Sequence, residues 1–258
     1  MPAHPIKGMV LAAGFGTRLR PITNLYPKPL VPFLGSTPLE LATRRLSDAG
    51  IEEVAINGHY LAEQIESFVR SGKKQGKRLH YSFEPEILGT GGAYNPIRPW
   101  LGTEHHLLAY NGDVLTHIDL TALIQFHFDG KFVATMAVLP KPIAEESGVY
   151  CSHDQVLGFG KSPPDKTTAR NFACVQILSP QFLQQLPTEG SFDIISQGYQ
   201  PILNQGLKVG AFLYDGYWED IRNLRIYLSA QLALLDNKEV ARKVWGEQLY
   251  NDKFPVHA

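Results

Sequence analysis

Residues 11–32 read Leu-Ala-Ala-Gly-Phe-Gly-Thr-Arg-Leu-Arg-Pro-Ile-Thr-Asn-Leu-Tyr-Pro-Lys-Pro-Leu-Val-Pro. The apolar residues at the start of this stretch predict the end of a buried strand. Gly14 and Gly16 then let the backbone turn and pass close to a ligand, because glycine has no Cβ. Arg18 adds a planar fork of donors, and Lys28 adds a point charge framed by two prolines. Together these features predict a phosphate site for a nucleoside triphosphate.

Other interpretations of this turn are weaker. A dinucleotide-binding fingerprint needs a third glycine where Leu19 stands. A P-loop needs Gly-Lys-Ser/Thr after a glycine and four spacers, and the chain has no such run. A tight turn without a ligand would explain the glycines alone. It would not explain the three cations Arg18, Arg20 and Lys28, which favour phosphate binding.

Composition excludes several classes of protein. With 258 residues, 44% of them hydrophobic and 19% charged, the chain is typical of a globular protein. A formal net charge of −1 does not suggest nucleic-acid binding. No apolar run approaches the roughly 20 residues that span a bilayer, and the N-terminus has no signal-peptide pattern. We expect Cys151 and Cys174 to be reduced, so we expect a cytoplasmic protein without a membrane partner.

Strand-like and helix-like segments alternate in the first half. Residues 37–40 form a capping box that starts one helix and has proline at the first helical position. The alternation predicts an α/β fold with a mostly parallel sheet that is covered on both faces. Ligands bind beyond the carboxyl ends of such strands, where the turn at 14–18 and Asp113 both lie. The predicted strands are 8–11, 54–56, 79–83, 106–110 and 133–138, and the predicted helices are 39–49, 61–69 and 120–128.

The pattern changes after Gly148. Short strand-like runs at 149–152, 156–159 and 172–178 predict a small β-rich insertion. Helices are predicted at 194–203, at 224–235 and in the last 20 residues. An apolar stripe within 224–235 belongs either to the core or to a homodimer face. No repeat follows the main body, so we expect no C-terminal β-helix.

Five further blocks of sequence give the chain a more specific pattern than the opening turn alone. They are Leu88-Gly89-Thr90-Gly91-Gly92-Ala93 after Glu84, Asn111-Gly112-Asp113, Phe159-Gly160-Lys161, Gly216-Tyr217-Trp218-Glu219-Asp220-Ile221, and the Pro-Lys-Pro run around Lys28. With the opening turn, they resemble the signature of the sugar-1-phosphate nucleotidylyltransferases, also called NDP-sugar pyrophosphorylases, over about residues 7–235.

The resemblance implies a fold and a reaction. It implies a Rossmann-like nucleotidylyltransferase fold whose insertion binds the sugar, with Mg²⁺ as cofactor. A nucleotidyl group would pass from an NTP to a sugar 1-phosphate, with release of pyrophosphate. We expect one domain, 1–258, with an NTP-binding half at 7–120, a sugar-phosphate half at 121–222 and C-terminal helices at 223–258.

The resemblance also assigns the site residues. The catalytic residues would be Arg18, Lys28 and Asp113, and the metal ligands Asp113 and Asp220, whose hard oxygen atoms suit Mg²⁺. Glu219 is not assigned, since neighbouring strand residues point to opposite faces. The nucleotide-binding residues would be Leu11, Ala12, Ala13, Gly14, Gly16, Thr17, Arg18, Glu84, Gly89 and Thr90. The sugar phosphate would meet Lys28, Gly148, Lys161 and Trp218.

The motifs identify the type of reaction more closely than they identify the base or the sugar. Glu84 falls where the family contacts the base, and a carboxylate suits guanine, which presents two adjacent donors. The alternative is a solvated Glu84 with the base held by backbone. Two positions depart from the family: Gly160 replaces the usual Glu, and Arg222-Asn223 replaces the usual Gly-Thr.

Length and motifs are most similar to mannose- or heptose-1-phosphate guanylyltransferases, which favours GTP. N-acetylmuramate-1-phosphate uridylyltransferases and glucose-1-phosphate thymidylyl- or uridylyltransferases stay open. A hypothesis from another class is a non-catalytic regulatory subunit that binds an NDP-sugar. The presence of both candidate metal ligands and both phosphate cations disfavours it.

Overall fold

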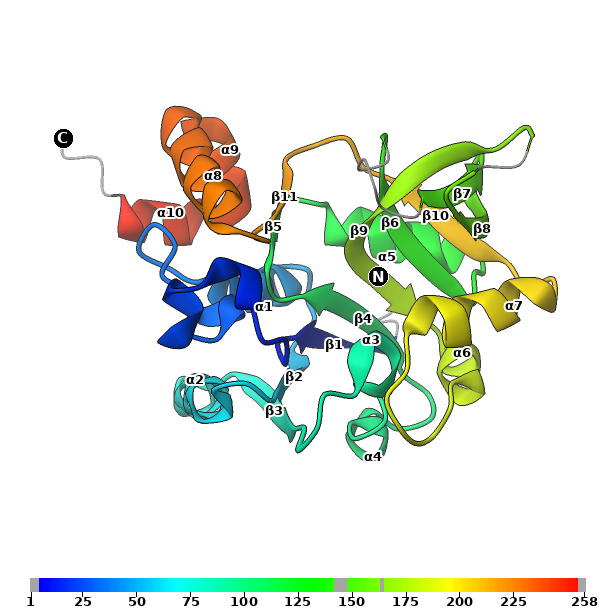
Figure 1. Cartoon of the computed structure of the whole chain (residues 1–258), viewed down its shortest axis with the longest axis horizontal. Helices are drawn as coiled ribbons and strands as arrows, with labels where there is room; N and C mark the ends of the chain where they lie inside the picture. The colour runs from blue at the N-terminus through cyan, green and yellow to red at the C-terminus, as the bar shows by residue number, and fades with distance from the viewer. Residues whose placement is uncertain (1–4, 142–147, 163–164, 255–258) are drawn as a thin grey trace. The chain divides into compact units, whose positions relative to one another are not determined.

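The computed structural model describes residues 5–141, 148–162 and 165–254 (Figure 1). The chain forms two compact units, and each unit is assembled from separate stretches. Unit 1 comprises Met1–Met9, Glu84–Tyr110 and Asp119–Asp215, and unit 2 comprises Val10–Phe83, Asn111–Ile118 and Gly216–Ala258. The expectation of one domain with three consecutive parts stays a prediction.

Unit 2 contains the glycine-rich turn at 14–18 and Lys28. Strand β1 (Ile6–Leu11) leads into the turn, and β2 (Glu53–Gly58) and β3 (Arg78–Phe83) pair in parallel with Val54 opposite Leu79. A second, antiparallel pair joins β5 (Val114–Thr116) to β11 (Trp218–Asp220). The other elements are η1 (Thr17–Leu19), η2 (Ile22–Asn24), η3 (Lys28–Leu30), α1 (Pro38–Asp48), α2 (Ala62–Lys74), α8 (Leu224–Asp236), α9 (Lys238–Trp245) and α10 (Glu247–Lys253).

The predicted capping box starts α1. Glu40 N donates to the Thr37 hydroxyl over 3.2 Å, and Pro38 occupies the first turn. Ser36 Oγ also donates to the Glu40 carboxylate, at 2.7 Å. The inner face of α1 is buried through Leu39, Ala42 and Leu46.

Unit 1 carries a mixed sheet in the order β4-β9-β6-β10-β8-β7. Its strands are β4 (His106–Asn111), β6 (Ala134–Leu139), β7 (Gly148–Ser152), β8 (Gln155–Gly160), β9 (Thr168–Leu178) and β10 (Val209–Leu213). Its helical segments are α3 (Gly89–Gly92), α4 (Arg98–Leu101), α5 (Leu120–Asp129), α6 (Pro180–Gln185), the π-helical turn η4 (Ile195–Tyr199) and α7 (Gln200–Asn204).

The prediction of a mostly parallel sheet is wrong for unit 1. Of the pairings between its described strands, β6–β10 is parallel, whereas β9 runs antiparallel to β4, β6 and β7, and β8 runs antiparallel to β7 and β10. Strand β9 lies between β4 and β6, with Leu178 opposite both Leu107 and Ala134. The sequence pattern placed this strand in an insertion. Pairing over such a distance along the chain leaves no local signal, and only about two-thirds of consecutive strands are neighbours.

Each unit has its own buried core. In unit 2, Phe33 stacks on Trp245 with 5.8 Å between ring centroids, and both rings are buried. In unit 1, buried Gln176 donates to Tyr94 Oη over 2.9 Å and accepts from Tyr199 Oη over 2.6 Å. Cys151 and Cys174 are both free thiols, as predicted. Within the described ranges, no helix has the length and apolarity to cross a bilayer.

Candidate active site

The glycine-rich turn of unit 2 is anchored at its start and packed at its second glycine. Ala12 N donates to the buried Asn57 side chain over 2.6 Å. Gly16 has φ +62°, and a Cβ there would lie 2.9 Å from Lys28 Cβ. The Thr23 hydroxyl donates to Gly16 O at 2.8 Å. The turn therefore packs directly beside Lys28, which requires glycine at position 16.

Gly14 differs from Gly16. It is exposed, it is not among the glycines with positive φ, and a Cβ there would meet nothing within 4 Å. Only the second glycine thus adopts a left-handed conformation that favours glycine. The space beside Gly14 is open to a ligand.

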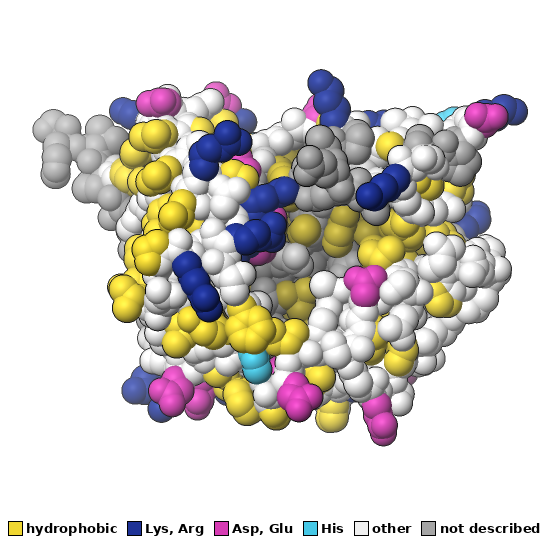
Figure 2. Space-filling view, viewed as in Figure 1, with side chains coloured by type: hydrophobic (Ala, Val, Ile, Leu, Met, Phe, Trp, Pro, Cys, Tyr) yellow, Lys and Arg dark blue, Asp and Glu magenta, His cyan; other side chains and the backbone are white. Residues whose placement is uncertain are grey.

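Arg18 lies in η1 with an exposed side chain, next to buried Leu19. Within the described part of the chain, no carboxylate or carbonyl pairs with its guanidinium. Lys and Arg side chains also gather on the face that Figure 2 shows. An exposed, unpaired guanidinium is available to bind a phosphate in a bidentate manner.

Lys28 lies at the centre of an ion cluster. Its Nζ donates to Asp113 Oδ2 over 2.5 Å and to Asp220 Oδ1 over 3.2 Å. The three side chains are 13%, 26% and 22% exposed, respectively. The structure thus brings together three of the predicted site residues from distant parts of the sequence.

The strand pair β5–β11 holds the two carboxylates near each other. Asp113 directly precedes β5, and Asp220 is the last residue of β11, opposite Val114. Ile221 N donates to Asp113 O over 3.1 Å, which extends the pairing past the strand ends. Val114 and Ile221 are buried, so packing fixes the backbone on which both carboxylates stand.

The pKa values follow from burial and charge. Burial alone would lower the pKa of Lys28, but the charges of Asp113 and Asp220 and their hydrogen bonds to Lys28 together outweigh burial and raise it. Burial and the neighbouring charge of Asp113 raise the pKa of Asp220, against the opposing effect of Lys28. At neutral pH the lysine is therefore charged, and its single positive charge offsets part of the charge of the two carboxylates.

Sequence reasoning missed a direct role for Arg222. Its Nε lies 3.4 Å from Asp220 Oδ2, so Asp220 contacts a cation through each oxygen. The sequence held one signal for this residue: Arg222 follows Asp220-Ile221, where the family usually has Gly-Thr. Glu219 stands beside Asp220 in β11 but forms no ion pair with Lys28. Burial raises the pKa of Glu219, and Arg222 lowers it.

The second glycine-rich segment, α3 in unit 1, is packed against its own unit. A Cβ on Gly91 would lie 2.2 Å from the Phe192 ring, and one on Gly89 would lie 2.7 Å from Phe192 O. Thr90 Oγ1 donates to Asp193 Oδ2 over 3.1 Å and accepts from Ile194 N over 3.1 Å. Internal packing accounts for these residues.

Glu84 is buried, with 1% of its surface exposed, and its carboxylate accepts from Leu88 N over 3.1 Å. The alternative of a solvated Glu84 is therefore wrong. The carboxylate stabilises the segment that leads into α3.

The β7–β8 hairpin carries two predicted sugar-phosphate residues. Gly148 stands opposite Gly160, and Lys161 follows with an exposed side chain. A Cβ on Gly160 would lie 2.5 Å from Tyr150 Oη, so a larger residue at position 160 would require Tyr150 to shift. Trp218, also predicted for the sugar phosphate, is half-buried in β11 of unit 2, opposite Thr116.

Known proteins resemble this chain over nearly its whole length. Residues 7–237 match the nucleotidyl transferase family model. A UTP–glucose-1-phosphate uridylyltransferase of Synechocystis is 29% identical and covers 90% of this chain. A mannose-1-phosphate guanylyltransferase of Mycobacterium tuberculosis is 26% identical and covers 98%.

These matches cover 64% and 72% of the two relatives, so the chain spans about two-thirds of their length. The solved structure of HddC from Yersinia pseudotuberculosis shares the fold, with a TM-score of 0.71 at 21% identity over 89% of this chain and 99% of that one. Because the family model matches almost the entire described sequence, the chain belongs to the nucleotidyl transferase family.

Proposed function

We propose that this protein transfers a nucleotidyl group from an NTP to a sugar 1-phosphate and releases pyrophosphate. One observation carries the proposal: Lys28, Asp113 and Asp220 converge beside a glycine-rich turn that presents an unpaired Arg18. Relatives named as sugar-1-phosphate uridylyl- and guanylyltransferases support the reaction class.

A divalent metal fits the carboxylate pair. Asp113 and Asp220 each place an oxygen within 3.2 Å of one cationic nitrogen, so both oxygens already converge on a shared positive charge. Mg²⁺ prefers one or two carboxylates together with substrate phosphates. We propose that these two residues hold Mg²⁺, which would neutralise charge on the phosphates when it is bound. No described group of three or more His, Cys, Asp or Glu offers another site.

The remaining steps use the chain's own groups. The attacking phosphate oxygen of the sugar 1-phosphate is already an anion, so no general base is required. Catalysis then consists of positioning and charge neutralisation. Arg18 and the amides of residues 14–17 would bind the β- and γ-phosphates. Lys28 would neutralise the α-phosphate and the incoming phosphate.

The residues of unit 1 complete the proposal. Lys161, beside Gly148 and Gly160, would hold the sugar phosphate, because its ammonium group is exposed and unpaired within the described chain. GTP is the proposed nucleotide, because a carboxylate suits guanine; Glu84 is buried and accepts from Leu88 N, so it would have to change partner to accept hydrogen bonds from the base. The mannose-1-phosphate guanylyltransferase among the relatives supports the same choice.

A pyrophosphate-release screen tests the proposal. The wild-type protein is assayed with Mg²⁺, four or five NTPs and a panel of sugar 1-phosphates that includes mannose, heptose, glucose and N-acetylmuramate 1-phosphates. We expect turnover with at least one combination, highest with GTP. The Asp113→Ala variant is the control and should lose turnover by about 10²–10³ while it stays folded. Binding of an NDP-sugar without turnover over the whole panel would instead identify a regulatory subunit.

A further inference from the structure

Helix α8 is apolar on two faces. Tyr227, Ala230 and Leu234 pack inward into the core of unit 2. On the outer face, Leu228, Leu232 and Leu235 are 57%, 62% and 49% exposed. A surface helix of a globular protein normally turns polar residues outward, whereas a helix that is apolar all round is buried. The apolar stripe predicted for 224–235 thus belongs to the core on one side and lies open on the other.

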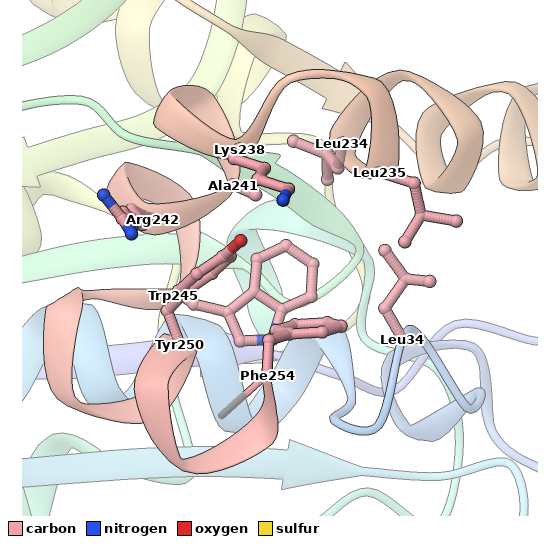
Figure 3. A pocket seen from close by; sticks show the side chains of 9 residues that line it. All are labelled: Leu34, Leu234, Leu235, Lys238, Ala241, Arg242, Trp245, Tyr250 and Phe254. Carbon is pink, nitrogen blue, oxygen red and sulfur yellow. The ribbon is translucent and has the colours of Figure 1, made fainter. Parts of the chain in front are cut away.

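The exposed leucines form one continuous surface, which we call the α8 seam (Leu228, Leu232 and Leu235). Figure 2 shows hydrophobic side chains on the visible face over α8. In Figure 3, Leu235 points towards Leu34 at the edge of a cavity of about 400 Å³ lined by residues of α8, α9 and α10. The seam therefore borders further apolar surface of the same unit.

The spacing and the end charges of the seam are self-complementary. Arg225, Leu228, Leu232 and Leu235 follow one another at intervals of three, four and three residues, the a/d spacing of a coiled-coil contact. Arg225 stands at one end, and Asp236 directly follows Leu235 at the other. Both are exposed, and neither forms an ion pair within the described part of the chain.

We propose that the α8 seam is a dimer face on which a second copy of this chain docks with its own α8 antiparallel. Leu228 then packs against Leu232 of the second copy, and Leu235 covers the aliphatic part of the second copy's Arg225. That guanidinium reaches Asp236, and the two-fold axis produces the same ion pair twice. A parallel arrangement would place Arg225 against Arg225 and Asp236 against Asp236, so charge selects the antiparallel pair.

The size of the contact sets its expected strength. One helix pair buries less than the roughly 800 Å² per partner of a standard interface. We therefore expect a weak dimer that dissociates on dilution, with a Kd on the order of 1–100 µM. The dimer proposal is independent of the proposed reaction, because no catalytic residue lies on the seam.

Sedimentation of the full chain over a range of concentrations tests whether the α8 seam forms a dimer. The wild type should shift from monomer to dimer as concentration rises. Leu232→Glu should raise the dimer Kd at least about tenfold, since it places two charges in the apolar seam. Leu157→Glu is the matched control, because Leu157 is 53% exposed on β8 and lies outside the seam. A wild type that stays monomeric up to about 100 µM, or a dimer that Leu232→Glu leaves intact, would overturn the proposal.

A mixing experiment tests the antiparallel arrangement. Arg225→Asp alone and Asp236→Arg alone each create two like-charge contacts and should weaken the homodimer. An equal mixture of the two variants restores both ion pairs and should form a heterodimer about as readily as the wild type. Thermal melting confirms that each variant is folded. Failure of the mixture to associate, when the wild type does, would contradict the proposed pairing.

Discussion

The two glycine-rich segments look alike in sequence but have different physical roles. In the turn at 14–18, Gly14 faces open space, and Arg18 is exposed and unpaired within the described chain. In α3, Gly91 has no room for a Cβ beside the Phe192 ring, and Thr90 is hydrogen-bonded to Asp193. The first segment leaves its backbone accessible, and the second is filled by its own unit.

This difference shows why a glycine-rich motif needs its environment before it is assigned to a ligand. A glycine can be required by a close neighbour, by a positive φ, or by a bound molecule. Gly91 is required by a close neighbour, and Gly16 by both a close neighbour and a positive φ. Neither reason applies to Gly14, which leaves a bound molecule as the reason. Substitutions at these positions therefore separate packing from binding.

Arg18→Ala should have the largest effect on activity. Removal of a positioned charge that stabilises a transition state typically costs about 10²–10³ in rate, and Arg18 makes no internal contact whose loss would unfold the protein. Steady-state kinetics of pyrophosphate release measure the loss. Lys74→Ala is the control, because Lys74 carries an equal charge, is exposed in α2 and lies outside the glycine-rich turn. An equal loss in both variants would indicate a general charge effect and not a specific phosphate contact.

Gly91→Ala should have the largest effect on stability. The new Cβ would lie 2.2 Å from the Phe192 ring, and overpacking of this kind typically costs about 1–3 kcal/mol. Urea denaturation measures the loss. Phe192→Leu removes the conflicting ring atoms, so the double variant should be more stable than the sum of the single effects predicts. Additive effects would show that the ring does not restrict position 91.

Lys28→Met should lower the stability of the protein, because it leaves two neighbouring carboxylates without a counter-charge. Without metal, the melting temperature should fall, and Mg²⁺ should raise it more in the variant than in the wild type, where Lys28 competes for the same oxygens. Burial and Asp113 raise the pKa of Asp220, so the folded variant binds a proton more readily than the unfolded chain. Its stability should therefore fall as pH rises above about 3.9, the ordinary value for aspartate.

Melting curves with EDTA or Mg²⁺ across this pH range measure both effects. An equal Mg²⁺ response in the variant and the wild type would contradict a metal at Asp113 and Asp220.

Gly14→Ala should have the smallest effect on the fold. No atom lies within 4 Å of the new methyl group, so the free energy of unfolding should change by less than about 0.5 kcal/mol. Binding should still weaken, because the methyl group occupies space that the proposed triphosphate needs. Titration with a non-hydrolysable NTP measures the affinity. Unchanged affinity in a stable variant would remove Gly14 from the proposed site.

Local features were predictable from the sequence, and long-range features were less so. Thr37 caps α1 as expected because the capping box is contained within four residues. The position of β9 between β4 and β6 was missed, since strand pairing over tens of residues has no local pattern. The cluster of Lys28, Asp113 and Asp220 was expected only through the family resemblance. The contact between Arg222 and Asp220 was not foreseen, although both residues stand in the same block.

The ion cluster also has a consequence for how the protein folds. Lys28 is 85 positions from Asp113 and 192 positions from Asp220, and their meeting depends on a strand pair that closes a long loop. Contacts between residues so far apart in sequence form late, and they make folding slower, because the loop must close before the contacts stabilise it. During synthesis, the glycine-rich turn emerges from the ribosome long before Asp220 does. The nascent chain therefore carries its glycine-rich turn without the second carboxylate while the residues between them are synthesised.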